Sequence, residues 1–158
     1  MKLRKPEIRT LEFRRELDAE YSYLCDDDAA YLTFHCDPGG YLNPKLKERY
    51  SEIVLERQTL RNAMADLSED KRQKRGIEID REIAEKRFEA IYTHCVKSWE
   101  TNIIDADTGK PMESTTDSFM ALCAAEIPGI SSVCLELSRF IENTAQFVAK
   151  AEEELEKN

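Results

Sequence analysis

The 158-residue chain contains few of the residues that shape turn-rich folds, with only five glycines and five prolines. Charged residues, by contrast, make up 35% of it. A sandwich or barrel needs many tight turns, whereas this balance is typical of long solvated helices. We therefore expect a mainly α protein, of a length that suits a single domain spanning residues 1–158.

The sequence also lacks any apolar run of about 18 residues, and its first ten residues have no apolar core of the kind that a signal peptide needs. Its five cysteines are an odd number without paired spacing, which argues against a disulfide framework and favours reduced, buried thiols. These absences predict a cytoplasmic protein with no membrane partner.

Motifs for catalysis and phosphate binding are missing as well. The chain has no nucleophile elbow, no phosphate-binding glycine loop and no dinucleotide fingerprint, and its two histidines offer little choice of a general base. We identify no catalytic, cofactor-binding or metal-ligating residue. The sequence thus favours a binding or structural role over an enzyme.

Acidic residues outnumber basic ones, 32 to 23, which gives a formal charge of −9. Such a charge repels nucleic-acid backbones unless the basic residues gather on one surface. The first fifteen residues are locally basic, and a basic run of this kind most often solvates a terminus. We therefore expect no nucleic-acid partner.

Two adjacent His-Cys pairs, His35-Cys36 and His94-Cys95, come closest to a constellation of metal ligands. Zinc accepts both residue types, but neither pair has the spacing of a known zinc motif. A small metal-binding regulator is therefore kept only as an alternative hypothesis. The segment from Asp105 to Gly109 departs from the calcium-loop pattern and is interpreted as a turn.

Period-two alternation marks two short strands in the N-terminal forty residues. Arg9 to Arg14 and Ala30 to Cys36 alternate apolar with polar side chains, and Asp37-Pro38-Gly39-Gly40 ends the second strand. An isolated hairpin is marginal in water, so we expect residues 1–40 to form a small strand-containing element covered by other parts of the chain.

Helical spacing begins at Asn43, which is followed by proline as in a capped helix start, and continues to Leu67. After a polar stretch, the spacing resumes from Ile83 to Trp99 with charged residues on the opposite face. These patterns predict a long helical hairpin over residues 43–100.

A turn-rich segment, Asn102 to Glu113, separates this hairpin from a C-terminal helical region at residues 114–158. There, a short helix capped by Thr115 or Thr116 precedes a final amphipathic helix from Ile130 to Leu155. We expect two helix pairs packed as a helical bundle.

Residues 96–158 carry a resemblance to a known family. The order of features is Val96-Lys-Ser-Trp99, an Asp105-x-Asp107-x-Gly109 turn, a capped short helix, Ile127-Pro128 and a closing helix that ends in Lys-Asn. This layout resembles the C-terminal half of tail assembly chaperones of long-tailed bacteriophages.

The resemblance implies a non-catalytic protein of the host cell cytoplasm that binds the tape-measure protein, helps recruit tail-tube subunits and is absent from the finished virion. It supplies no site residues, and self-association stays open. Aromatic anchors are common at interfaces, so the candidate partner-binding residues are Trp99, Phe119, Phe140 and Phe147. The final helix and the 102–113 segment are candidate partner surfaces. A structural virion or adaptor protein of helical type is the main alternative.

Overall fold

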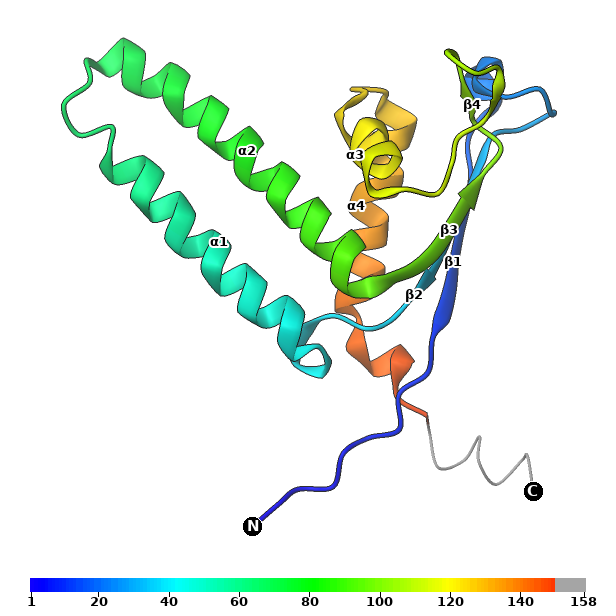
Figure 1. Cartoon of the computed structure of the whole chain (residues 1–158), viewed down its shortest axis with the longest axis horizontal. Coiled ribbons are helices and arrows are strands. Elements are labelled where there is room, and N and C mark those ends of the chain that lie inside the picture. Colours follow the sequence, from blue (N-terminus) through cyan, green and yellow to red (C-terminus); the bar gives the residue numbers. More distant parts are fainter. Residues whose placement is uncertain (150–158) are drawn as a thin grey trace.

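The computed structural model describes residues 1–149 and has an α+β architecture, in which a small sheet and two helices form a body and a helical hairpin projects from it (Figure 1). The main elements in chain order are β1 (Leu11–Glu16), β2 (Tyr31–Cys36), α1 (Pro44–Asn62), α2 (Glu69–Cys95), β3 (Val96–Thr101), β4 (Ile104–Asp105), β5 (Lys110–Pro111), α3 (Thr116–Ala124) and α4 (Pro128–Glu142). Three 3-10 helices add η1 (Ala19–Leu24), η2 (Gly40–Leu42) and η3 (Thr144–Phe147). The predicted mainly α fold, a small strand element followed by two helix pairs packed as a bundle, is therefore wrong.

The body contains a three-stranded antiparallel sheet in the order β1-β2-β3. Phe34 on β2 pairs with Phe13 on β1 and with Trp99 on β3, which aligns three aromatic side chains across the sheet. All three are at most 3% exposed. Because alternate residues of a strand share a face, this register buries the centre of one side of the sheet.

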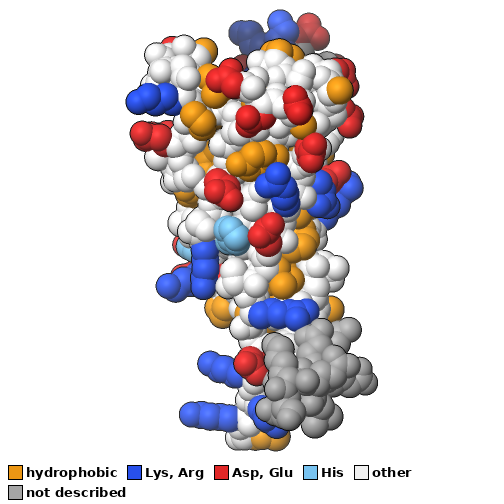
Figure 2. Space-filling model, turned by 90° about the vertical axis from the view of Figure 1, so that its right-hand side faces the viewer, with side chains coloured by type: hydrophobic (Ala, Val, Ile, Leu, Met, Phe, Trp, Pro, Cys, Tyr) orange, Lys and Arg blue, Asp and Glu red, His pale blue; other side chains and the backbone are white. Residues whose placement is uncertain are grey.

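The other side of the sheet carries mainly polar side chains. Arg14 on β1 stacks its guanidinium 4.1 Å above the Tyr31 ring and donates a hydrogen bond to the Thr33 hydroxyl. Figure 2 looks onto this side of the molecule, where acidic side chains lie mainly in the upper half and basic ones mainly in the lower half. Hydrophobic patches lie between them. This mixture is typical of a solvated sheet face.

Helices α3 and α4 cover the buried side of the sheet (Figure 1). α3 begins at a Thr115 cap, whose hydroxyl accepts from the Ser118 amide, and it inserts Phe119 between Phe34, Trp99 and Tyr92. These contacts form the centre of the hydrophobic core.

Among residues 1–149, no single helix is long and apolar enough to cross a membrane. α3 and α4 reach the required length and composition only when taken together, and a bend of 120° separates them.

Helices α1 and α2 form an antiparallel hairpin, called here the arm, that extends away from the sheet (Figure 1). α1 faces α2 with a narrow apolar stripe whose members Leu46, Ile53 and Leu60 lie seven residues apart. α2 contributes buried Ile79 and Ile83. A seven-residue spacing places one side chain every two turns, so these three residues lie along one face of α1.

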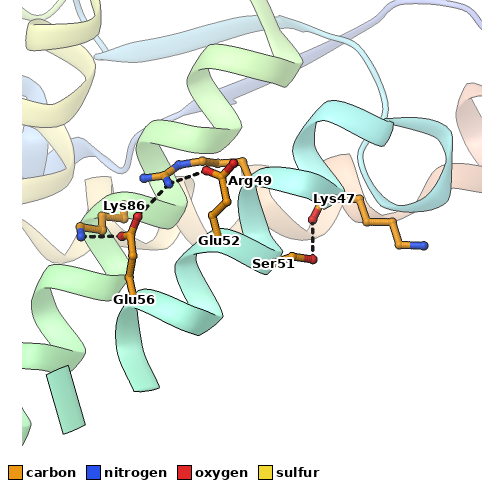
Figure 3. A network of polar contacts seen from close by, with 6 residues as sticks. All are labelled: Lys47, Arg49, Ser51, Glu52, Glu56 and Lys86. Carbon is orange, nitrogen blue, oxygen red and sulfur yellow. Dashed lines mark hydrogen bonds and ion pairs between the residues drawn. The ribbon is translucent and has the colours of Figure 1, made fainter. Parts of the chain in front are cut away.

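Salt bridges flank this stripe. Lys86 on α2 reaches Glu56 on α1 at 2.6 Å, and Glu56 also accepts from Arg49 at 3.1 Å (Figure 3). Nearer the tip of the arm, Asp80 on α2 accepts from Arg57 and Arg61 on α1. Exposed ion pairs of this kind add little free energy, but they fix which helix faces meet.

Several predicted boundaries also need correction. The second hairpin helix ends at Cys95 instead of Trp99, because Val96–Thr101 pairs with β2 as a strand. The polar stretch before it belongs to α2, which begins at Glu69. The final helix ends at Glu142 instead of Leu155, and η3 follows; the predicted helical residues 150–155 lie outside the described part of the chain.

Candidate protein-binding surface

The four aromatic residues predicted to bind a partner lie in or against the core. Trp99 stacks on Phe34 with ring centroids 5.8 Å apart, and Phe119 meets Phe34 edge-on at 6.0 Å. Phe147 packs against Phe140 at 5.5 Å, and Phe140 is the one member of the four that is partly exposed. These rings hold the sheet to α3, α4 and η3, so their first role is in packing.

The two His-Cys pairs are brought to the same region, where β2 ends and α2 passes into β3. The Asp37 amide donates to the Cys95 carbonyl, and Cys36 pairs with Val96. Burial raises the pKa of the Cys36 and Cys95 thiols to about 12 each, which disfavours the thiolate that zinc needs. Within residues 1–149, no group of three or more His, Cys, Asp or Glu side chains is arranged to hold a metal ion.

The 102–113 segment forms the small β4–β5 hairpin. At its tip, the Asp107 amide donates to Asp105 Oδ1 at 2.9 Å, and Gly109 has a φ of +71° that suits glycine. The Asp105 carboxylate thus serves a turn, as predicted. Asn102 at the start of the segment is buried. Its Oδ1 accepts from the Tyr31 amide, and its Nδ2 donates to Asp27 Oδ2 and to the Ala29 carbonyl, which fixes the hairpin to the body.

A hollow of about 350 Å³ lies where the arm meets the body. We call it the basal groove, and its lining residues come from η2, α1 and the end of α4: Gly40, Tyr41, Leu46, Lys47, Tyr50, Ser51, Val54 and Glu142. Tyr41 and Val54 are 71% and 56% exposed, and both line the same hollow. The groove therefore offers an open, largely apolar surface to another molecule.

The α1 side of the groove follows from helical spacing. Lys47, Tyr50 and Val54 lie three and four residues apart, so they share one face of α1, next to the stripe that packs on α2. Gly40 supports the other side with a φ of +55°, a conformation that glycine adopts without strain. A β-carbon at Gly39, just before η2, would lie 2.9 Å from the Ile141 side chain, so the chain packs tightly on α4 at this point.

Two titratable groups lie at the partly buried wall of the groove. Burial raises the pKa of the Tyr50 hydroxyl to about 12, and the nearby Glu142 carboxylate adds to the shift. Burial also raises the pKa of Glu142 itself. Glu142 is the last residue of α4, where the helix dipole is negative. The dipole therefore disfavours the charged form of this carboxyl further.

The neutral substitution Glu142→Gln is expected to raise the melting temperature slightly at about pH 7. A carboxyl whose pKa is higher in the folded than in the unfolded state favours folding while it is protonated, and this contribution fades as the pH rises through the folded pKa. The gain should therefore vanish at about pH 4, where Glu142 is largely protonated.

Thermal melts of both proteins at the two pH values check this prediction, with the exposed Glu48→Gln on α1 as the control. A lower melting temperature for Glu142→Gln at neutral pH would show that its carboxylate stabilises the fold instead.

Apolar exposure continues along the arm beyond the groove. Leu55 on α1 is 64% exposed and Ile77 on α2 is 62% exposed, although both belong to long helices that pack on each other. Ile77 also lines a hollow between the tips of the two helices, with Arg61 and Met64. The arm thus presents separate apolar points along its length, set among charged side chains.

Comparisons with protein-family models, with curated proteins and with solved structures found no match.

The basal groove was missed by the reasoning from sequence. The helical spacing of apolar residues in α1 includes both Ile53 and Val54. It does not show which of these two neighbouring side chains faces α2 and which faces solvent. A signal was present in Tyr41, an aromatic residue beside Gly39-Gly40 in a segment interpreted as a strand terminator. An aromatic side chain in a turn is often exposed unless another element covers it.

Proposed function

We propose that this chain is a tail assembly chaperone of a long-tailed bacteriophage, which acts without catalysis in the host cytoplasm. It would bind the tape-measure protein and help recruit tail-tube subunits. The observation that carries the proposal is the arm with its basal groove, a projecting helical surface with exposed apolar side chains at Tyr41, Val54 and Leu55.

The groove suits a helical partner. A long helical protein presents single apolar side chains at intervals of three and four residues, and grooves beside helices are a common receptor for such anchors. Tyr41, Tyr50 and Val54 offer a hydrophobic wall, and Lys47 and Glu142 supply charges of both signs at its rim. A single groove of this size should bind with modest affinity. Several copies of this chain bound along one long partner would together hold it more strongly.

Such binding would cover the exposed apolar side chains of the partner until it is assembled. A long chain with exposed apolar stripes associates with its own copies unless those stripes are covered before assembly. A cover with a net charge of −9 makes the coated chains repel one another. A contact limited to a small groove can also be released when tube subunits arrive.

The groove substitutions Tyr41→Asp and Val54→Asp are each expected to weaken binding to the tape-measure protein by at least about tenfold, which corresponds to about 1.4 kcal/mol. Each puts a charge where the partner's apolar side chain would lie, yet both positions are solvent-exposed, so the fold should be kept. The measurement is affinity purification of the tagged chain co-expressed with its neighbouring genes, followed by titration of the recovered partner.

Leu135→Asp is the matched control, because Leu135 is a similarly exposed leucine on α4 that does not line the groove. It should bind like the unchanged chain. Recovery of no long helical partner would remove the chaperone proposal, whereas recovery that is equally strong for all three variants would remove only the groove as its site.

Purified particles separate the proposal from its main alternative. A chaperone should be absent from mature virions, and a structural or adaptor protein should be present in stoichiometric amount. The metal-binding alternative predicts bound zinc in chelator-free protein, which elemental analysis measures directly.

A further inference from the structure

Two cysteine thiols from different helices meet beside the core. The Sγ atoms of Cys123 on α3 and Cys134 on α4 lie 3.5 Å apart. Cys134 is buried at 5% exposure, while Cys123 is partly open to solvent. The pair therefore combines a thiol that a small reagent can reach with a second thiol already in contact with the first.

We propose that Cys123 and Cys134 form a thiol–disulfide exchange site, which reacts with small disulfides of the glutathione class and closes into an intramolecular disulfide between α3 and α4. This site is independent of the proposed chaperone function. It also differs from the reduced, buried thiols expected from the odd number of cysteines.

The geometry is close to what the bond requires. A disulfide has an S–S length of about 2.0 Å, so the two sulfurs must approach by roughly 1.5 Å. Rotation of the two side chains about their Cα–Cβ bonds can supply a movement of that size. Only eleven positions separate the cysteines along the chain, and the turn between the helices already brings their elements together.

The chemistry balances in two steps. The Cys123 thiol loses its proton and attacks one sulfur of the small disulfide, whose S–S bond breaks and releases one thiolate that is then protonated. The Cys134 thiolate then attacks Cys123 Sγ and expels the second small thiol. Two protein thiols are thus oxidised to one disulfide, while the small disulfide is reduced to two thiols.

The environment assigns different parts to the two sulfurs. Hydrogen bonding between them lowers the pKa of Cys134 against the opposing effect of burial, and it raises the pKa of Cys123. This hydrogen bond is lost once Cys123 carries the small thiol, so it is the 3.5 Å contact between the two sulfurs that places Cys134 for the second, resolving attack. The first step depends on deprotonation of Cys123, so the overall reaction should become faster as the pH rises.

The test incubates the folded full-length chain with oxidised glutathione, blocks the remaining thiols by alkylation and maps the products by peptide mass spectrometry. We expect a Cys123–Cys134 crosslink, a fall in alkylatable thiols from five to three, and a higher melting temperature for the oxidised chain, since the crosslink restricts its unfolded state.

Variants separate the two steps. Cys134→Ser should stop at a stable glutathione adduct on Cys123, Cys123→Ser should form neither adduct nor crosslink, and Cys36→Ser should crosslink like the unchanged chain. Circular dichroism confirms that each variant is folded, and the crosslink map of the unchanged chain does not depend on them. Alkylation of both Cys123 and Cys134 after oxidation, or a crosslink that joins other cysteines first, would overturn the proposal.

Discussion

Phe119→Ala is expected to lower the free energy of unfolding by about 3 to 5 kcal/mol, the range for removing a large buried aromatic side chain. Phe119 is fully buried, and its ring lies 5.2 Å from Tyr92, 6.0 Å from Phe34 and 6.2 Å from Trp99. It therefore joins α3 to α2 and to two strands of the sheet. Its loss leaves a cavity that four elements would have to close together.

Chemical denaturation followed by tryptophan fluorescence measures this loss, because Trp99 is the single tryptophan and contacts the changed site. Phe119→Leu is the control and should cost less, about 1.5 kcal/mol, since it keeps most of the buried volume. Equal stability of Phe119→Ala and the unchanged chain would mean that α3 does not pack on the sheet as described.

Asn43→Ala is expected to cost about 2 to 4 kcal/mol, the second-largest effect on stability. The Asn43 side chain has two tasks. Its Oδ1 accepts from the Leu46 amide and caps α1, and its Nδ2 donates to the Pro38 and His94 carbonyls at 3.0 Å each. One residue thus joins the start of α1, the end of β2 and the end of α2 at the base of the arm.

Asn43→Asp separates the two tasks in the same denaturation experiment. It keeps an oxygen that can cap α1 but sets its second carboxylate oxygen against the Pro38 and His94 carbonyl oxygens, so its stability should fall well below that of the unchanged chain. If Asn43→Asp were as stable as asparagine, the bonds to Pro38 and His94 would contribute nothing, and the cap alone would hold the arm.

Local signals predicted most of the helices and two of the strands. The Asn43-Pro44 start, the Thr115 cap and the alternation from Ala30 to Cys36 each depend on neighbouring residues, and each is confirmed by the structure. Such signals act over a few residues, which is why a single sequence reveals them.

The third strand could not be found in this way. The spacing of Cys95, Val96 and Trp99 fits a helix, while the spacing of Trp99 and Thr101 fits a strand equally well, so the pattern alone does not decide between them. The choice is made by β2, more than sixty residues away, whose free edge accepts Val96–Thr101 and buries Trp99 against Phe34. This tertiary pairing turned a predicted helical bundle into an α+β fold.

Exposure was the other quantity that periodicity did not provide. An apolar stripe predicts a packed face but does not say whether another element or solvent lies opposite. Phe119 and Phe147 are fully buried, whereas Tyr41 and Val54 are exposed, and the spacing of Phe119 and Val54 along their helices does not distinguish the buried side chain from the exposed one. The candidate surface therefore became visible only with the arm and the end of α4 in place.

Hydrogen–deuterium exchange of this chain, alone and with the tape-measure protein that we propose as its partner, tests the central claim most directly. The account predicts slower exchange on binding in residues 40–55, which hold η2 and the groove side of α1, and unchanged exchange in β1 (Leu11–Glu16) on the far side of the body. Protection confined to the sheet or to α3 and α4, with residues 40–55 unchanged, would contradict it.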